Sequence, residues 1–318
     1  MDSTSNKTAR ISGAVNNKNG LRNSIKKHPV LYIMLAPGIV FMLIFRYIPM
    51  YGVVLAFKEW NLVKGIFGSP WIGFENFRYL FNSRDFLNVF RNSVWISLIR
   101  IFWGFPAPII LALMLNEVRN QINKRVTQTL LYLPHFISWV IIAGIVMNFT
   151  SVNNGVINEI IKIFGGQPIA FLQSERYFRS VLVVSEIWKS AGWGTIVYLA
   201  AISGVDPSLY EAAIVDGANR MQRIWHITFP GITNTIVVLL ILRTGSILNN
   251  GFEQIYMLYS PLVYDVADVF ETYSYRIGLA GGRFSYGTAI GMFQSVVGLI
   301  LIFTTNTISK RLGEGGMW

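Results

Sequence analysis

Six apolar stretches constrain the fold of this chain more than any other feature of its sequence. Each is close to the roughly 20 residues that an α-helix needs to cross the hydrocarbon core of a bilayer. They lie at about residues 29–57, 92–115, 128–149, 180–203, 232–258 and 286–308. Because backbone polar groups find no water in lipid, helices are the expected spanning elements. We therefore expect an all-α membrane protein with six transmembrane helices.

The composition supports a membrane protein and excludes several classes of function. Hydrophobic residues make up 53% of the chain and charged residues 14%, whereas a soluble domain carries about 25% charged residues. The net charge of +11 fits an excess of Lys and Arg in cytoplasmic loops better than nucleic-acid binding. With no cysteine and three widely separated histidines, the sequence predicts no metal site, disulfide or cofactor.

The distribution of charge predicts the domain organisation and the orientation. Residues 1–27 are polar and basic, which indicates a disordered cytoplasmic arm. A transmembrane domain is expected over 28–309, followed by a cytoplasmic tail over 310–318. Basic pairs at 26–27, 124–125 and 310–311 lie beside predicted spans and favour the cytoplasmic side. An even number of spans then places both termini in the cytoplasm.

A non-spanning stretch, residues 204–231, separates the fourth and fifth apolar segments. Asp206 is a good N-cap and Pro207 suits the first helical position, which predicts a short helix to about residue 215. Gly217 permits a sharp bend. A second helix is then expected, with Pro230 as the corner where the chain re-enters the membrane. The stretch is interpreted either as a docking knuckle for a protein partner or as an amphipathic helix on the membrane surface.

The same stretch resembles a known motif. Glu211-Ala-Ala-x-x-Asp216-Gly-Ala218, followed by Trp225-x-Ile-x-x-Pro230, is similar to the EAA motif of type I ABC importer permeases. The resemblance implies that this loop is a coupling helix seated in a cleft of an ATPase subunit. The residues that would contact the ATPase are Glu211, Ala212, Asp216, Gly217 and Ala218.

The resemblance extends over nearly the whole chain, and within the family the chain looks like the LplB-type oligosaccharide permeases, which are relatives of the alginate importer subunit. It is carried by segments 47–52, 65–74, 104–108, 132–138, 284–289 and 311–315. It implies a multi-pass subunit of the bacterial cytoplasmic membrane that transports an oligosaccharide. The implied partners are a second permease, two ATP-binding subunits and an extracellular substrate-binding lipoprotein. Unlike the maltose-type relative, this chain has no large external domain between its early spans.

The sequence contains no phosphate-binding loop. Such a loop needs G-x-x-x-x-G-K-[ST], and the nearest approach, Gly282 to Gly287, is followed by Thr288 where the lysine should stand. We therefore expect ATP hydrolysis on a separate subunit and no enzymatic activity here. The alternative is an integral-membrane glycosyl- or phospho-transferase built on the acids Asp265, Asp268 and Glu271, but we expect these loop acids to be solvated.

Ionisable residues inside a membrane span are costly and are candidates for function. Arg100 is one, and two further sets recur at helical spacing, which would place each set on one helix face. The fourth-span set is Glu186, Lys189, Ser190 and Trp193, and the fifth-span set is Arg243, Ser246, Asn249, Asn250 and Glu253. They are interpreted as the lining of a saccharide cavity, with Arg243 favouring an acidic oligosaccharide, or as structural contacts between helices.

Overall fold

The computed structural model describes residues 26–311 and divides into two compact units, Met1–Val54 and Leu55–Trp318. Most of the expected N-terminal arm and most of the expected tail therefore lie outside the described residues. Within 26–311 the regular structure is helical, apart from an isolated bridge between Lys58 and Trp71. This agrees with the predicted all-α class.

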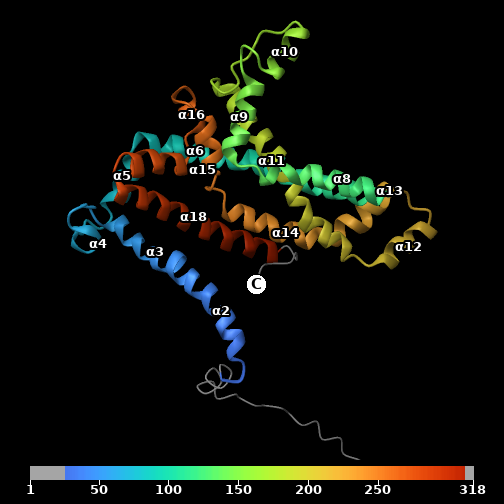
Figure 1. Ribbon diagram of the computed structural model, residues 1–318, viewed down its shortest axis with the longest axis horizontal. Coiled ribbons are helices and arrows are strands. Elements are labelled where there is room, and N and C mark those ends of the chain that lie inside the picture. Colours follow the sequence, from blue (N-terminus) through green and yellow to red (C-terminus); the bar gives the residue numbers. More distant parts are fainter. Residues whose placement is uncertain (1–25, 312–318) are drawn as a thin grey trace, which may run out of the picture. The chain divides into compact units, whose positions relative to one another are not determined.

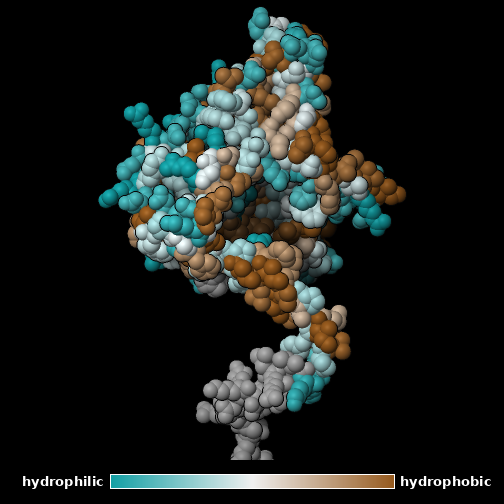
Figure 2. Space-filling model, turned by 60° about the vertical axis from the view of Figure 1, so that its left-hand side comes forward, coloured by the Kyte–Doolittle hydropathy of each residue, from teal (hydrophilic) through white to brown (hydrophobic). Residues whose placement is uncertain are grey.

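The first unit is dominated by an apolar helical run. It consists of α2 (Pro29–Met42), a π-helical turn η1 (Leu43–Tyr47) and α3 (Ile48–Met50), and it continues into η2 (Tyr51–Phe57). Leu31, Ile33 and Met34 are all exposed, and none of the residues of α2 is buried. Figure 2 shows the apolar side chains of this segment in brown. A helix that is apolar all round is typical of a membrane span.

The second unit contains the remaining helices (Figure 1). Its first half comprises α4 (Gly65–Gly68), α5 (Glu75–Asn82), α6 (Arg84–Ile99), η3 (Arg100–Gly104), α7 (Pro106–Asn116), α8 (Gln121–Tyr132), η4 (Leu133–Phe136), α9 (Trp139–Thr150), α10 (Val156–Ile163) and α11 (Glu175–Ser203). Its second half comprises α12 (Pro207–Val215), α13 (Arg220–Arg223), η5 (Ile224–Thr228), α14 (Phe229–Gly245), α15 (Phe252–Leu258), η6 (Pro261–Val263), α16 (Tyr264–Ala267), α17 (Phe270–Tyr273), η7 (Ser274–Ala280) and α18 (Phe284–Arg311).

Four helical runs among the described residues are long and apolar enough to cross a membrane: Pro29–Phe57, Arg84–Asn116, Arg220–Gly245 and Phe284–Arg311. A fifth candidate is the pair Gln121–Phe136 and Trp139–Thr150, which is bent by 101°. The expected third span, 128–149, is therefore not a straight helix. Pro134 lacks the N–H of a regular helix, and the chain around it forms a short 3₁₀ turn before α9 begins.

The expected fifth span, 232–258, is also wrong in its extent. α14 ends at Gly245, residues 246–251 are irregular, and the short α15 starts afresh at Phe252. Gly251 has φ +72, a left-handed conformation that glycine adopts without penalty. The fifth-span residues beyond Gly245 consequently do not share a helix face with Arg243.

Three π-helical turns precede prolines in the apolar runs. Each turn ends two residues before its proline and includes the residue four positions before the proline. In a regular α-helix the carbonyl oxygen of that residue would have no hydrogen-bond donor, because proline lacks a backbone N–H. The turns are η1, η3 and η5, and the prolines are Pro49, Pro106 and Pro230. Pro230 is therefore not a re-entry corner, because the helical run continues through it from Arg220 to Gly245.

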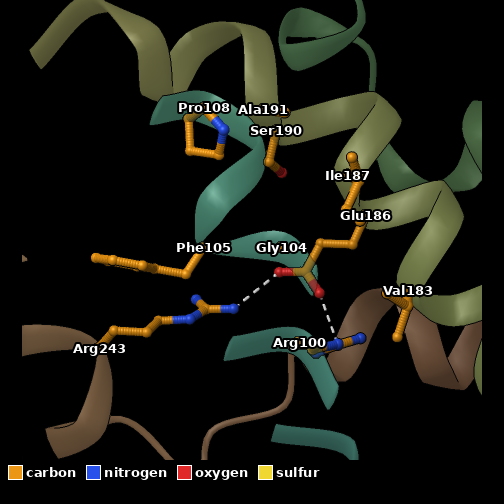
Figure 3. A pocket seen from close by; sticks show the side chains of 10 residues that line it. All are labelled: Arg100, Gly104, Phe105, Pro108, Val183, Glu186, Ile187, Ser190, Ala191 and Arg243. Carbon is orange, nitrogen blue, oxygen red and sulfur yellow. Dashed lines mark hydrogen bonds and ion pairs between the residues drawn. The ribbon is translucent and has the colours of Figure 1, made fainter. Parts of the chain in front are cut away.

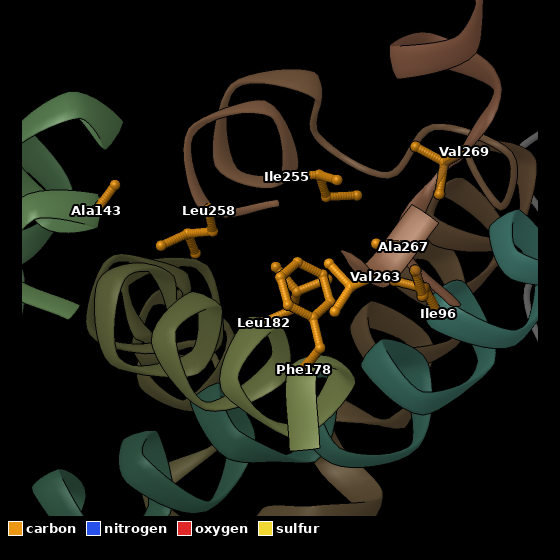
Figure 4. Packing of buried hydrophobic residues seen from close by; sticks show 9 residues of the cluster. All are labelled: Ile96, Ala143, Phe178, Leu182, Ile255, Leu258, Val263, Ala267 and Val269. Carbon is orange, nitrogen blue, oxygen red and sulfur yellow. The ribbon is translucent and has the colours of Figure 1, made fainter. Parts of the chain in front are cut away.

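One hydrophobic cluster packs the short helices that follow α14 against the long helix α11 (Figure 4). Phe178 and Leu182 of α11 are fully buried against Ile255 of α15, Val263 of η6 and Ala267 of α16. Fully burying one side chain of the size of Phe, Leu, Ile or Val contributes about 1.5–3 kcal/mol relative to leaving it in water. The cluster thus holds α15, η6 and α16, which follow the irregular segment 246–251, in place on α11.

The packing of α11 against its neighbours depends on a close backbone approach. A Cβ atom added at Gly192 would lie 1.9 Å from the carbonyl oxygen of Leu131 in α8. α11 also contacts α7 and α14, and Figure 1 shows α14 running beside α18. α11 is therefore in contact with α7, α8 and α14, and α12 lies on the loop between α11 and α14.

Candidate functional site

A pocket of about 190 Å³ lies between three segments of the second unit: the η3–α7 region, α11 and α14. Its lining residues are Arg100, Gly104, Phe105, Pro108, Val183, Glu186, Ile187, Ser190, Ala191 and Arg243. Figure 3 shows Glu186 reaching from α11 between the two arginines. The pocket therefore combines apolar walls with one carboxylate and two guanidinium groups.

Glu186 pairs with both arginines. Its Oε2 atom lies 2.5 Å from Nε of Arg100, and its Oε1 atom lies 3.1 Å from Nη2 of Arg243. The Arg100 side chain is only 5% exposed, whereas that of Arg243 is 42% exposed. A buried charge is tolerated when it is paired and hydrogen-bonded, so Arg100 is the structural member of the trio. Arg243 is the member that a ligand can reach.

Both terminal nitrogens of Arg100 also donate hydrogen bonds. Nη1 donates to the carbonyl oxygen of Asn250, and Nη2 donates to Oε1 of Gln254. Nε2 of Gln254 in turn donates to the carbonyl oxygen of Leu182 at 2.7 Å and to Ser185 at 2.8 Å. Arg100 sits in the π-helical turn η3, an element often found at functional sites. It ties the start of α15 to α11.

The break at 246–251 is held by polar contacts. Nδ2 of Asn250 donates to the carbonyl oxygen of Ser93 at 3.1 Å, and Ser97 donates to Oδ1 of Asn250 at 2.9 Å. The backbone N–H of Asn250 donates to Oε1 of Glu271 at 2.5 Å. Asn250 is fully buried, so it acts as a structural link between α6 and α17.

The fourth-span set divides between the pocket and the packing of helices. Glu186 and Ser190 line the pocket. Lys189 is buried and donates to the carbonyl oxygens of Pro134, His135 and Ile137, so the pairing of Glu186 with Lys189 is not formed. The ring of Trp193 stacks on His135, with centroids 4.6 Å apart.

In the fifth-span set, Arg243 is the residue that lines the pocket. Ser246 donates to the carbonyl oxygen of Arg243 at 3.0 Å, and Asn250 is buried. Asn249 and Glu253 are exposed. The helical spacing that grouped these residues ends at Gly245, because the chain is irregular from 246 to 251.

Two of the acids expected to be solvated are withdrawn from solvent: Asp268 is buried and Glu271 is half-buried. Asp268 accepts a hydrogen bond from Thr272 at 2.7 Å and pairs with Arg276, while burial raises the pKa of its carboxyl. Glu271 accepts from the backbone of Asn250. Asp265 is exposed. Among residues 26–311, no three His, Asp or Glu side chains are grouped as metal ligands.

The expected docking knuckle forms a compact turn. α12 spans Pro207–Val215, and Asp206 caps it by accepting from the N–H of Ser208 at 2.9 Å. Gly217 has φ +78, and the N–H of Ala218 donates to Ala213 at 2.8 Å. The candidate contacts are exposed or half-buried: Glu211, Ala212, Asp216, Gly217 and Ala218. Figure 1 shows α12 at one end of the second unit.

The knuckle also exposes apolar side chains. Val215 is 87% exposed, and Ile214, Leu209 and Met221 are exposed as well. Isolated exposed apolar residues are normal, but several on one short helical turn indicate an interaction surface. Next to them, Asp216, Gly217, Arg223 and His226 line a shallow pocket.

The sequence profile of the family described as "Binding-protein-dependent transport system inner membrane component" matches residues 104–314. The chain belongs to this family. The matched range contains α7, α11, α12 and α14, and therefore the greater part of the pocket and the whole knuckle.

Similar proteins support this assignment. Protein LplB of Bacillus subtilis (strain 168) is 48% identical over 295 residues, which cover 93% of each chain. The polygalacturonan/rhamnogalacturonan transport system permease protein YteP of the same organism is 46% identical and covers 91% of this chain and 90% of its own. A solved bacterial ABC transporter involved in the import of the acidic polysaccharide alginate contains a chain with 46% identity and a TM-score of 0.83, covering 92% and 98%.

The predicted resemblance is thereby confirmed. The chain has the fold of type I ABC importer permeases and is a transport permease subunit of the cytoplasmic membrane. These similarities give no support to the membrane-transferase alternative.

Proposed function

We propose that this chain forms, with a second permease subunit, the pathway of an ABC importer that carries an oligosaccharide into the cell. The observation that carries the proposal is the pocket in which Glu186 holds Arg243 at 3.1 Å while Arg243 remains partly exposed. A guanidinium has five N–H donors, so pairing with Glu186 leaves donors for a ligand. Hydroxyl and carboxylate oxygens of a saccharide are suitable acceptors.

The proposed topology has six spans. Five are the candidate runs described above, and the sixth is α11, whose 29 residues extend about 43 Å at 1.5 Å per residue. Arg179, Glu186 and Lys189 make α11 polar for a span, but each is bonded to another part of the chain. With six spans and α12 on the cytoplasmic side, both termini are cytoplasmic.

The proposed energy coupling runs through α12. This helix lies on the loop between α11 and α14, and those two helices carry Glu186 and Arg243. A displacement of α12 by a closing ATPase would therefore move both sides of the pocket. Two ATP-binding subunits would supply the energy, and an extracellular substrate-binding lipoprotein would deliver the saccharide, in line with the family's binding-protein dependence.

The preferred substrate is an acidic oligosaccharide. A guanidinium can pair bidentately with a carboxylate, and Arg243 offers a partly exposed guanidinium in the pocket. The relatives named for polygalacturonan/rhamnogalacturonan and for the acidic polysaccharide alginate support the same class.

The test is uptake by the assembled transporter. The chain is affinity-purified from its host with its bound subunits, reconstituted in proteoliposomes and supplied with ATP and receptor. We expect ATP-dependent accumulation of labelled tetragalacturonate and co-purification of an ATPase. Sugar-modifying activity without accumulation would instead support a transferase.

A further inference from the structure

A second pocket, with mainly apolar walls and a few polar groups, lies between the start of α15, α17, η7 and the start of α18. Its volume is about 410 Å³, and it is distinct from the pocket of Arg243. The lining residues that carry the argument are Phe252, Glu271, Ser274, Tyr275, Phe284 and Thr288. We propose that this pocket is a saccharide subsite that binds a neutral, hydroxyl-rich pyranose unit of the transported oligosaccharide. The proposal rests on the proposed function and extends it.

Aromatic rings form part of the wall. The rings of Phe252 and Tyr275 have centroids 5.0 Å apart, and Tyr256 contacts both at 5.0 Å. All three are half-buried, not enclosed in the core. The apolar face of a pyranose ring packs on such rings, since aromatic side chains offer large, rigid contact surfaces at low entropic cost.

The polar groups of this pocket are hydrogen-bond acceptors. Ser274 donates its proton to the carbonyl oxygen of Gly287 at 3.2 Å, and Thr288 donates to that of Phe284 at 2.9 Å. Their oxygens keep free lone pairs. Glu271 uses Oε1 to accept from Asn250, while Oε2 is buried without a hydrogen-bond partner among the described residues.

The hydroxyl oxygens of Ser274 and Thr288, beside aromatic walls, suit a ligand that is rich in donors. Sugar hydroxyls meet this need. A uronate carboxylate would instead be repelled by Glu271. The pocket therefore selects a neutral sugar unit, whereas the donors of Arg243 select an acidic one.

The two pockets are joined by one polar network. Glu271 accepts from Asn250, the carbonyl oxygen of Asn250 accepts from Arg100, and Glu186 links Arg100 to Arg243. The two carboxylates and two guanidinium groups of this network balance in charge. Its negative end faces the second pocket and its positive end faces the first. An oligosaccharide that combines neutral and acidic units matches both ends.

The experiment compares uptake of tetragalacturonate and of its fully methyl-esterified, neutral form by the assembled transporter. Tyr275→Ala should raise KM about tenfold for the neutral form, a loss that corresponds to one aromatic contact. Tyr275→Phe should keep KM within about threefold, because the ring remains. Phe171→Ala, which alters a half-buried ring outside this pocket, should leave KM unchanged.

Selectivity separates a binding role from a structural one. Glu271→Gln keeps an acceptor for Asn250 but removes the charge, so the ratio of acidic to neutral uptake should rise at least threefold. An unchanged ratio, together with an unchanged KM in Tyr275→Ala, would overturn the subsite. Tighter binding of an amine-bearing analogue than of the neutral form would overturn it as well. Uptake of neither probe by the wild type would refute the proposed substrate class itself.

Discussion

Nε of Arg100 and Oε2 of Glu186 lie 2.5 Å apart although the two residues are 86 positions apart in the chain. This contact joins the π-helical turn before α7 to the middle of α11. It allows Glu186 to hold Arg243 with its second oxygen. The position of the exposed guanidinium in the pocket therefore depends on a buried pair beneath it.

Glu186→Gln should destabilise the protein by about 3 kcal/mol, because removing one partner leaves the buried charge of Arg100 uncompensated. The measurement is thermal unfolding of the purified chain in detergent. Glu253→Gln is the matched control, since Glu253 is exposed, and it should leave the midpoint within one or two degrees. Equal midpoints for the two variants would show that the pair adds nothing to stability.

Gly217→Pro should abolish receptor stimulation of the ATPase while the chain still inserts and assembles. Proline cannot adopt φ +78, the conformation that turns the chain after α12. Gly217→Asn is the control, because asparagine tolerates the left-handed region, and it should retain most of the stimulation. Full stimulation in the proline variant would refute the assignment of this turn to ATPase docking.

Glu211→Ala tests the same surface without altering the backbone. Glu211 is exposed on α12, so its loss should reduce coupled uptake and leave the unfolding midpoint unchanged. The measurement is uptake per ATP hydrolysed in proteoliposomes. An unchanged ratio of uptake to ATP hydrolysis would refute the assignment of Glu211 to the docking surface.

The N-cap of α12 should be insensitive to pH in the physiological range. A hydrogen bond from the backbone N–H of Ser208 lowers the pKa of Asp206. Because the folded pKa is lowered, the capping contribution is complete above the ordinary carboxyl pKa and is lost as the pH falls through the lowered value. ATPase stimulation should therefore stay constant between about pH 6 and 8. Asp206→Ala should weaken stimulation, and Asp206→Asn, which also caps, should preserve it.

Local signals in the sequence predicted local structure well. Asp206, Pro207 and Gly217 fixed the bounds of α12, because caps and turn residues act over a few positions. The prediction that the helix breaks at Pro230 was wrong, because the π-helical turn η5 accommodates the backbone N–H that proline lacks. The extent of the fifth span was wrong for the opposite reason, because the helix ends at Gly245 where the prediction continued it.

Long-range contacts could not be derived from spacing. Arg100 was recognised as a costly intramembrane cation, but its partners Glu186, Asn250 and Gln254 come from other elements. Burial of Glu271 depends on the same tertiary arrangement. The charge of these residues was a usable signal, whereas their pairing required the fold.

The most direct test of the proposed function is uptake of tetragalacturonate by the assembled transporter carrying Arg243→Gln, with the methyl-esterified form as the neutral reference. Loss of the guanidinium should lower acidic uptake about tenfold, which corresponds to about 1.4 kcal/mol of binding, and should leave neutral uptake within about twofold. Arg243→Lys should fall between, because it keeps the charge without the bidentate geometry. An equal fall for both saccharides, or no change in either, would contradict a substrate-binding role for Arg243.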